Sequence, residues 1–135
     1  MKKLLILLAL FATYTTQAQS RNQNYDPSRV TGQFFIKQTT AKGVEKINVN
    51  YYLSPAPFTK VLNFSLNTPQ PRMLSAKITN SSGRTVLTWK PQAKDYRYET
   101  EFNIATLQPG NYNVNVYDAG GVKLYSIPFS KSKLE

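Results

Sequence analysis

The sequence of 135 residues contains no cysteine and no histidine, and only 7 acidic residues accompany its 17 lysines and arginines. Without cysteine the chain has no thiolate for a zinc or iron–sulfur site, no thiol nucleophile and no disulfide. Without histidine it lacks the commonest general base and the commonest transition-metal ligand. The length is that of one domain. The composition therefore favours a binding, structural or targeting role over an enzymatic one, and it predicts no cofactor and no metal.

The first 18 residues have the layout of a secretory signal peptide. Lys2 and Lys3 make the start basic, residues 4–12 are uninterruptedly apolar, and small or polar residues lead up to Ala18. The apolar run of 9 residues is too short for a transmembrane helix, which takes about 20 residues. We place the cleavage site after Ala18. Because no cysteine follows to accept a lipid, we expect an exported protein that is neither anchored nor membrane-spanning.

Cleavage after Ala18 removes 18 of the 135 residues and leaves 117. It also removes Lys2 and Lys3, so 15 basic and 7 acidic residues remain, with a net charge of +8. An exported domain without disulfides must be held by its hydrophobic core, which is feasible for about 100 residues. Residues 19–32 are polar, and we predict a flexible N-terminal segment there. A tether or docking arm is its functional alternative.

Short stretches that alternate between apolar and polar residues occupy the rest of the chain. This period of two predicts strands with one buried and one exposed face. The stretches lie at residues 33–37, 46–53, 61–66, 74–78, 86–89, 98–104, 112–117 and 125–129. Breaks containing proline, glycine or both separate most of them, at residues 54–57, 68–71, 80–83, 90–92, 108–110 and 118–121.

This pattern predicts an all-β fold over residues 33–135: an antiparallel sandwich of the immunoglobulin or fibronectin type with seven to eight strands. A small closed barrel is the alternative, since the pattern does not separate the two. Pro128 lies inside the last stretch and cannot donate to a ladder, so that strand is expected at a sheet edge.

Candidates for catalysis are few. Glu99 and Glu101 are two residues apart on one predicted strand and would face the same side, as a pair of catalytic carboxylates could. They occupy the polar half of an alternating strand, however, which favours a solvated face. Asp118 precedes Gly120 and Gly121 and is better explained as a turn residue than as a calcium ligand, because no other acids cluster with it. We expect no enzymatic activity.

A possible ligand surface combines aromatic and cationic residues of the second half of the chain. Aromatic faces bind sugar rings, and the positive net charge attracts anionic polysaccharide or an acidic partner. The cations are spread along the chain, so a generic solubilising role for them is equally consistent. Because of the export signal, nucleic acid is not an expected partner. The residues of this surface are Trp89, Lys94, Tyr96, Arg97 and Tyr117, and Lys94 and Arg97 are predicted to share one loop.

Three sequence elements from about residue 52 onward follow one another in a characteristic order. Pro55 and Pro57 precede an alternating strand, and Gly83 follows a second strand in a turn. The most specific element leads into another alternating strand and comprises Leu107, Gly110 and Tyr112. A glycine turn at Gly120 and a basic last strand with Lys131 close the series.

Over residues 52–135 this series resembles the C-terminal sorting domain of the type IX secretion system of Gram-negative bacteria. The resemblance implies a non-catalytic β-sandwich that secretion machinery recognises by its folded surface and terminal strand. The sequence departs from the pattern at Ala56, where the family usually has asparagine, and in the tail after the basic strand. Residues 19–51 leave room for at most two strands upstream, rather than a cargo enzyme.

Two functions follow as hypotheses. The first is an exported sandwich that acts as a secretion substrate or cell-surface interaction module, with the secretion machinery or another cell-surface protein as partner. The second is a periplasmic or extracellular module that binds polysaccharide or an acidic partner. Both place the mature protein in the periplasm, at the cell surface or outside the cell.

Overall fold

The computed structural model describes residues 27–133, and every regular element in that range is a strand. The predicted signal peptide and residues 19–26 lie outside the described residues. Within residues 27–133 there is no helix with the length and apolarity that crossing a membrane requires. The strands are β1 (Val30–Thr40), β2 (Gly43–Ser54), β3 (Val61–Arg72), β4 (Ser75–Asn80), β5 (Thr85–Trp89), β6 (Asp95–Asn103), β7 (Gly110–Tyr117) and β8 (Lys123–Lys131).

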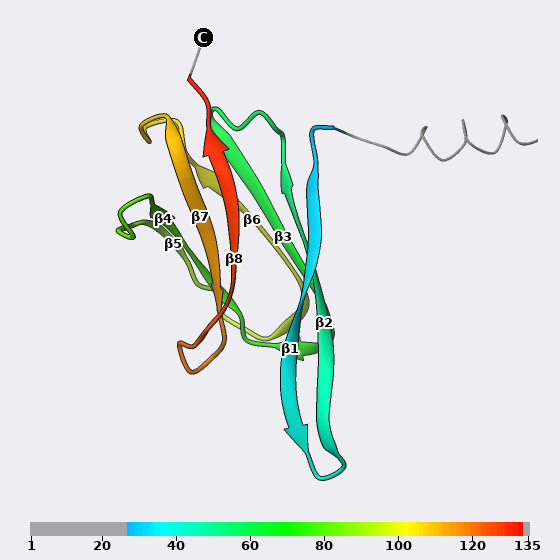
Figure 1. Cartoon of the computed structure of the whole chain (residues 1–135). Coiled ribbons are helices and arrows are strands. Elements are labelled where there is room, and N and C mark those ends of the chain that lie inside the picture. The colour runs from blue at the N-terminus through cyan, green and yellow to red at the C-terminus, as the bar shows by residue number, and fades with distance from the viewer. Residues whose placement is uncertain (1–26, 134–135) are drawn as a thin grey trace, which may run out of the picture.

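The strands form two four-stranded sheets that face each other (Figure 1). Sheet A has the order β1-β2-β3-β6, sheet B has the order β5-β4-β7-β8, and all pairings between these strands are antiparallel. The predicted antiparallel sandwich is therefore confirmed, with eight strands. Pro128 lies on β8, at an edge of sheet B, as predicted.

The core follows from the alternation in the sequence. On β3 the side chains of Leu62, Phe64 and Leu66 are buried, and they face the buried apolar side chains of sheet B. Phe64 packs against Trp89 of the opposite sheet with the ring centroids 6.4 Å apart. Burying one such side chain stabilises the fold by about 1.5–3 kcal/mol. In the absence of disulfides, the core of these alternating positions holds the two sheets together.

Three boundaries differ from the prediction. β1 begins at Val30, so residues 30–32 belong to a strand rather than to a flexible segment. Residues 68–71 form no chain-reversing turn, because β3 continues to Arg72 through an irregularity between Asn67 and Arg72. Arg97 lies on β6 and does not share a loop with Lys94, because β6 begins at Asp95.

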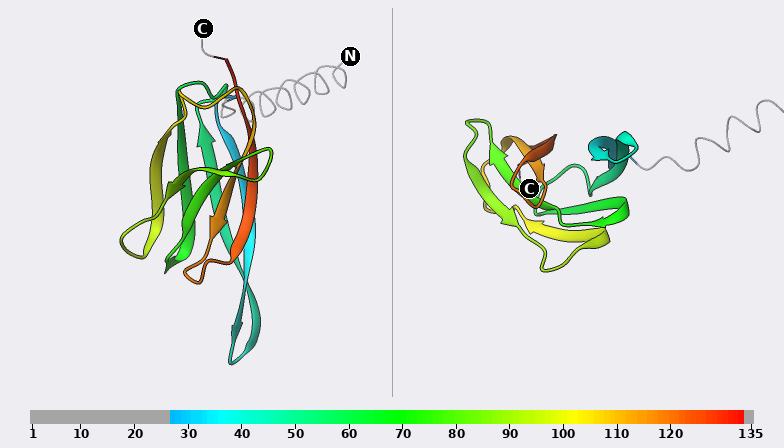
Figure 2. Two further views of the ribbon diagram at one scale, coloured as in Figure 1. Left: turned by 90° about the vertical axis from the view of Figure 1, so that its left-hand side faces the viewer. Right: turned by 90° about the horizontal axis from the view of Figure 1, so that it is seen from below.

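The β1–β2 hairpin is longer than the sandwich. Its strands pair over their whole length, from Val30 with Leu53 to Thr40 with Gly43. By contrast, β2 pairs with β3 only from Asn50 to Ser54. The far end of the hairpin therefore projects beyond the body of the molecule as a two-stranded ribbon (Figures 1 and 2). We call residues 37–46 the ribbon tip; every side chain in it is exposed or half-buried.

Candidate functional site

The connection between β2 and β3 contains Pro55 and Pro57 and joins three parts of the fold. The N–H of Ala56 donates to the carbonyl of Ser28, just before β1, at 2.7 Å. The carbonyl of Phe58 accepts from the N–H of Ser132, just after β8, at 2.8 Å. The connection thus ties the beginning of sheet A to the end of the last strand of sheet B.

Phe58 anchors this connection. Its side chain is 4% exposed and meets the ring of Phe129 on β8 edge-on, with centroids 5.7 Å apart. Its backbone pairs in parallel with Lys131 as an isolated bridge. The peptide bonds before Pro55 and Pro57 are both cis. Because one apolar side chain and one backbone bridge hold the same residue, the end of β8 has a fixed position on the sandwich.

Tyr112 holds the end of β8 through a second set of contacts. Its hydroxyl donates to the carbonyl of Gln108, four residues upstream, at 2.6 Å, and its ring stacks on Phe129 at 5.7 Å. A tyrosine at the start of a strand whose hydroxyl reaches back to the upstream backbone is the tyrosine corner found in immunoglobulin-type sandwiches. Leu107 packs against the core from this loop. Gly110 has a φ of 152°, a backbone conformation that favours glycine.

Lys131 is the last residue of β8 and lies opposite Gly110. It is only 4% exposed, and its Nζ donates to the carbonyl of Ser132 at 3.2 Å. A lysine in this position buries its aliphatic stem while the ammonium stays at a polar site. Six of the eight residues singled out for the sorting pattern therefore lie around the end of β8: Pro55, Pro57, Leu107, Gly110, Tyr112 and Lys131.

The other two residues of the pattern lie in tight turns. Gly83 has a φ of 85° in the β4–β5 turn, where the side-chain oxygen of Asn80 accepts backbone N–H groups from Ser82 and Arg84. Gly120 lies in the β7–β8 turn, where the side-chain oxygen of Asp118 accepts N–H groups from Gly120 and Val122, each at 2.9 Å. Asp118 is therefore a turn residue, as its sequence context indicated. These two glycines shape hairpins rather than the end of β8.

Comparison with known proteins agrees with this arrangement. Residues 52–127 match the family described as the secretion system C-terminal sorting domain, and the match covers more than half of the chain. The chain belongs to this family. No curated protein and no solved structure matches the chain. The resemblance to the type IX sorting domain is thus confirmed; it links the protein to that secretion machinery and indicates a secreted or cell-surface protein.

The sorting domain, taken as residues 52–127, comprises residues 52–54 at the end of β2, the strands β3 to β7, and most of β8. The end of β8 that Phe58 holds lies just past the matched residues. The β1–β2 hairpin lies almost entirely before them and extends sheet A by two strands. The sorting domain therefore supplies sheet B up to residue 127 of β8, together with the β3–β6 half of sheet A.

The aromatic residues of the predicted ligand surface are not side by side. Trp89 points into the sandwich, where its ring contacts Phe64 at 6.4 Å and Tyr98 at 5.3 Å. Tyr117 lies on sheet B with the ammonium of Lys77 over its ring, 5.3 Å from the centroid. Trp89 is therefore largely a packing residue, whereas Tyr117 keeps part of its ring at the surface.

The cationic and tyrosine residues of the β5–β6 region are likewise apart. Lys94 lies in the loop before β6, Tyr96 is exposed near the start of β6, and Arg97 lies on the outer face of sheet A. Arg97 is in an ion pair with Glu99 at 2.5 Å. The structure therefore brings Arg97 next to an acid rather than next to Trp89 or Tyr117, and the five residues do not form one binding platform.

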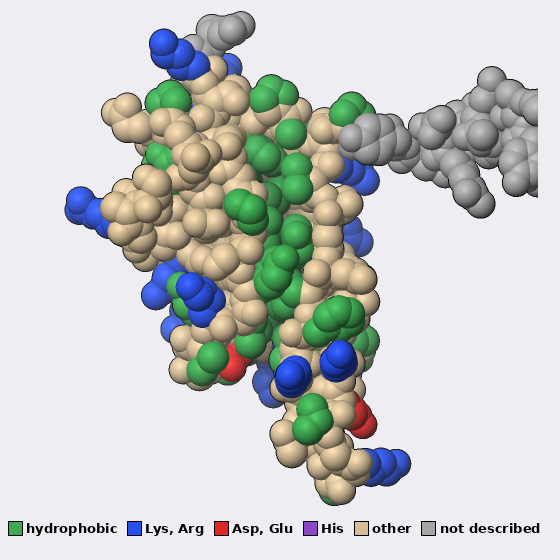
Figure 3. Space-filling view, viewed as in Figure 1, with side chains coloured by type: hydrophobic (Ala, Val, Ile, Leu, Met, Phe, Trp, Pro, Cys, Tyr) green, Lys and Arg blue, Asp and Glu red, His purple; other side chains and the backbone are tan. Residues whose placement is uncertain are grey.

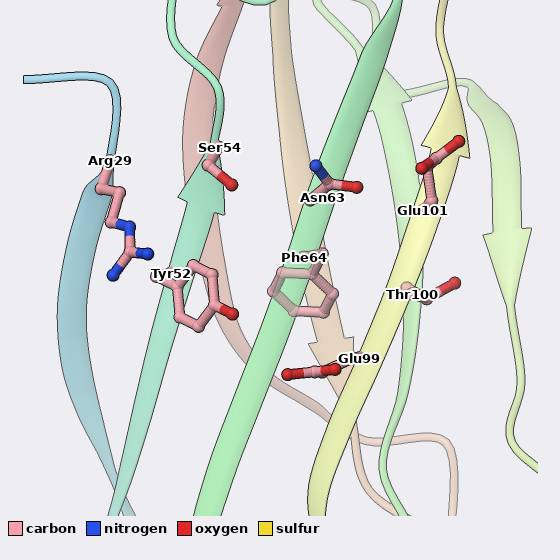
Figure 4. A pocket seen from close by; sticks show the side chains of 8 residues that line it. All are labelled: Arg29, Tyr52, Ser54, Asn63, Phe64, Glu99, Thr100 and Glu101. Atoms are coloured by element: carbon pink, nitrogen blue, oxygen red, sulfur yellow. The ribbon is translucent and has the colours of Figure 1, made fainter.

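An open groove runs across the outer face of sheet A (Figure 4). The side chain of Tyr52 points from β2 toward β3, Glu99 extends from β6 toward β3 from the other side, and Glu101 lies further along β6 (Figure 4). The negative charge of Glu99 raises the pKa of Arg97, and hydrogen bonds with Glu99 and Tyr52 act in the same direction. The groove is lined by Arg29, Tyr52, Ser54, Asn63, Phe64, Glu99, Thr100 and Glu101.

The two glutamates have the solvated setting that the sequence favoured. Both face the outside of sheet A, and the side chain of Glu99 is 58% exposed. A group so exposed and paired with an arginine is an ordinary surface carboxylate. The groove is polar and open, and its carboxylates sit in water rather than in an apolar pocket.

Sequence reasoning overlooked Phe58 because it stands in a proline-containing break between two strands. A large apolar residue directly after such prolines is itself a signal, because an exposed loop has little use for a phenylalanine. Tyr52, the tyrosine with which the resemblance to the sorting domain begins in the sequence, also opens the family match, and its side chain points from β2 toward β3 on the outer face of sheet A.

Proposed function

We propose that this protein is a substrate of the type IX secretion system and acts, without catalysis, as an interaction module at the cell surface or in the medium. The single observation that supports this best is the family match together with the convergence of six pattern residues at the end of β8. The secretion machinery would recognise this end as a folded surface: the Pro55–Phe58 connection, the tyrosine corner and the last residues of β8.

Lys131 offers a substitution that tests this recognition. It is the last residue of β8, its side chain is almost fully buried, and its ammonium donates to the carbonyl of Ser132. Lys123 is a lysine at the other end of the same strand and is exposed. The two lysines therefore provide a matched pair in which charge is removed at the proposed recognition site or away from it.

Export can be measured by fractionating cells that produce the full-length chain. We expect deletion from Val122 onward to leave the protein in the periplasm. We also expect Lys131→Met, which retains an unbranched apolar side chain, to lower the exported fraction several-fold, and Lys123→Met to leave it unchanged. Circular dichroism and thermal unfolding of the purified substitution variants separate loss of recognition from loss of fold. Unchanged export of the truncated chain would contradict the proposal.

A further inference from the structure

The four edges of the two sheets are protected to very different degrees. Exposed edge strands tend to pair with other chains unless charges, proline, irregular pairing or short length prevent it. β8 carries Pro128, β5 has only 5 residues, and β6 presents the charged Arg97, Glu99 and Glu101 on its outer face. β1 has 11 residues, contains no proline and pairs with β2 without a register shift. Within residues 27–133, β1 is thus the long, regular and weakly protected edge.

The outer face of β1 also carries an exposed aromatic side chain. Phe35 is 56% exposed at the middle of the strand, with the ammonium of Lys46 5.8 Å from its ring centroid. Lys37 is the only charged residue on β1, and it lies directly opposite Lys46 of β2. Like charges placed opposite each other are unfavourable, so this face gains from a neighbour that covers Phe35 without placing another cation directly opposite Lys37.

We propose that two copies of this protein pair antiparallel through β1 and form one continuous eight-stranded sheet around a two-fold axis at Phe35. β1 runs from residue 30 to residue 40, so Phe35 is its central residue. In that register Phe35 lies across from Phe35 of the second copy, and Lys37 lies across from Gln33. The strand is therefore self-complementary: it buries its exposed aromatic ring and places an amide, not a second cation, opposite its lysine.

An apolar seam beside β1 supports the same pairing. The rings of Phe34 and Tyr125 stack at 4.9 Å, and Tyr51 lies against Tyr125 at 5.9 Å, so they bridge the edges of the two sheets. Tyr125 is 38% exposed. Figure 3 shows hydrophobic side chains as a continuous band between the β8 side and the β1 side of the molecule. Two copies joined at β1 would bring their seams together, which adds apolar burial to the backbone ladder.

The unpaired backbone groups of β1 would hold the two copies together. Alternate residues of β1 turn their N–H and C=O groups away from β2. Two antiparallel copies would satisfy these groups with on the order of ten backbone hydrogen bonds. An acidic strand of another protein could use the same edge. A second copy is favoured because it pairs the exposed ring of Phe35 with an identical ring and Lys37 with Gln33.

Cysteine cross-linking tests the register directly, because the chain has no cysteine of its own. Residues directly opposite in an antiparallel ladder lie about 4.5–5.5 Å apart between Cα atoms, within the range of a disulfide. We expect Phe35→Cys to form a covalent dimer on mild oxidation, and Gln33→Cys to do so only when mixed with Lys37→Cys. The control is Tyr96→Cys, at an equally exposed aromatic position on β6, which should stay monomeric.

Charge variants test the pairing without removing Phe35. Gln33→Lys places a lysine across from Lys37 twice in the symmetric dimer and should raise the dissociation constant about tenfold. Gln33→Glu should lower it. Val44→Lys adds the same charge on β2, away from the free edge, and should leave it unchanged. Sedimentation velocity of the purified full chain between about 1 and 100 µM gives the dissociation constants.

Several results would overturn the proposal. One is a monomer throughout that concentration range; another is equal cross-linking of the cysteine variants at 33, 35 and 96. Capture of an acidic strand by a chain that never self-associates would assign the edge to a different partner. Because these measurements use purified protein, their outcome is independent of export.

Discussion

The sorting domain and the β1–β2 hairpin use the same alternating pattern but place it in different surroundings. In the sorting domain the apolar residues of each strand meet a second sheet, so Phe64, Val114 and Ile127 are almost fully buried. In the hairpin this holds only as far as Ile36 and Ile47; the side chains of the ribbon tip are exposed or half-buried, with Gln38 accepting a hydrogen bond from Arg72 of β3. The alternating pattern thus indicates that a segment is a strand. How many of its apolar side chains contribute to stability depends on how far the opposing sheet extends over them. The hairpin depends on the domain, because an isolated two-stranded ribbon is marginal at best.

Removing a core side chain of the sorting domain should have the largest effect on stability. Phe64→Ala deletes a ring that contacts Trp89 and Phe102, and we expect the free energy of unfolding to fall by about 3–5 kcal/mol. Val44→Ala in the ribbon tip, where the side chain is 67% exposed, should change it by less than about 0.5 kcal/mol. Urea denaturation followed by tryptophan fluorescence measures both. Equal losses of unfolding free energy would mean that the side chain of Val44 is packed as the core side chains are.

A glycine in β1 tests how the hairpin joins the body. A Cβ added at Gly32 would lie 2.3 Å from the hydroxyl oxygen of Tyr51 and 2.5 Å from its ring. Gly32→Ala should therefore displace Tyr51 and cost about 1–3 kcal/mol. Gly120→Ala is the control, since its Cβ would meet nothing closer than 3.5 Å. Equal urea midpoints for the two variants would mean that Tyr51 can move away from residue 32 without a measurable loss of stability.

The tyrosine corner of the sorting domain should contribute less. Tyr112→Phe keeps the ring on Phe129 but leaves the carbonyl of Gln108 without its donor. We expect a loss of about 1–2 kcal/mol. Tyr96→Phe removes a hydroxyl from an exposed ring and should have almost no effect. A neutral Tyr112→Phe would show that water replaces the hydroxyl at that carbonyl.

The smallest expected effect is a pH dependence at the seam between hairpin and domain. Burial raises the pKa of Tyr51 above its ordinary value of 10.0, and Tyr125 adds to the rise. The unfolded chain then ionises first, so this contribution is intact below pH 10.0 and is lost as the pH rises through the folded pKa. Tyr51→Phe should make the decline in unfolding free energy above that pH shallower. If the unfolding free energy falls with pH equally steeply in both proteins, the hydroxyl of Tyr51 is solvated in the folded state.

The strands were predictable because the period of two is a direct consequence of having one buried face. The boundary at residues 68–71 was not, because two prolines there look like a turn. In the structure Thr68 replaces the missing ladder bonds: its hydroxyl donates to the carbonyl of Gln70 at 2.7 Å and accepts the N–H of Gln70 at 3.3 Å. The hydroxyl of Tyr98 donates to the carbonyl of Arg72. Such side-chain bonds let a strand continue through an irregularity.

Part of the candidate site could likewise be predicted from the sequence, and part could not. The Leu107, Gly110 and Tyr112 element could be located from sequence because a positive-φ glycine and a corner tyrosine need fixed spacing. The ligand surface could not, because residues 86–89 form a compact run in which the orientation of Trp89 is ambiguous. The sequence pattern chose Gly120 for the last turn, whereas the positive φ of 81° is at Gly121. A pair of adjacent glycines does not reveal which one makes the bend.

The hydrogen bonds of Ala56 and Phe58 have a mechanical consequence. One joins the connection to Ser28 and the other joins it to Ser132, so both ends of the described chain are fastened to the same three residues. Tension between these ends would open those two bonds and the isolated bridge first, and only then peel β8 from β7 one pair at a time. We therefore expect the protein to begin opening at its ends before the side chains of the core bear the load.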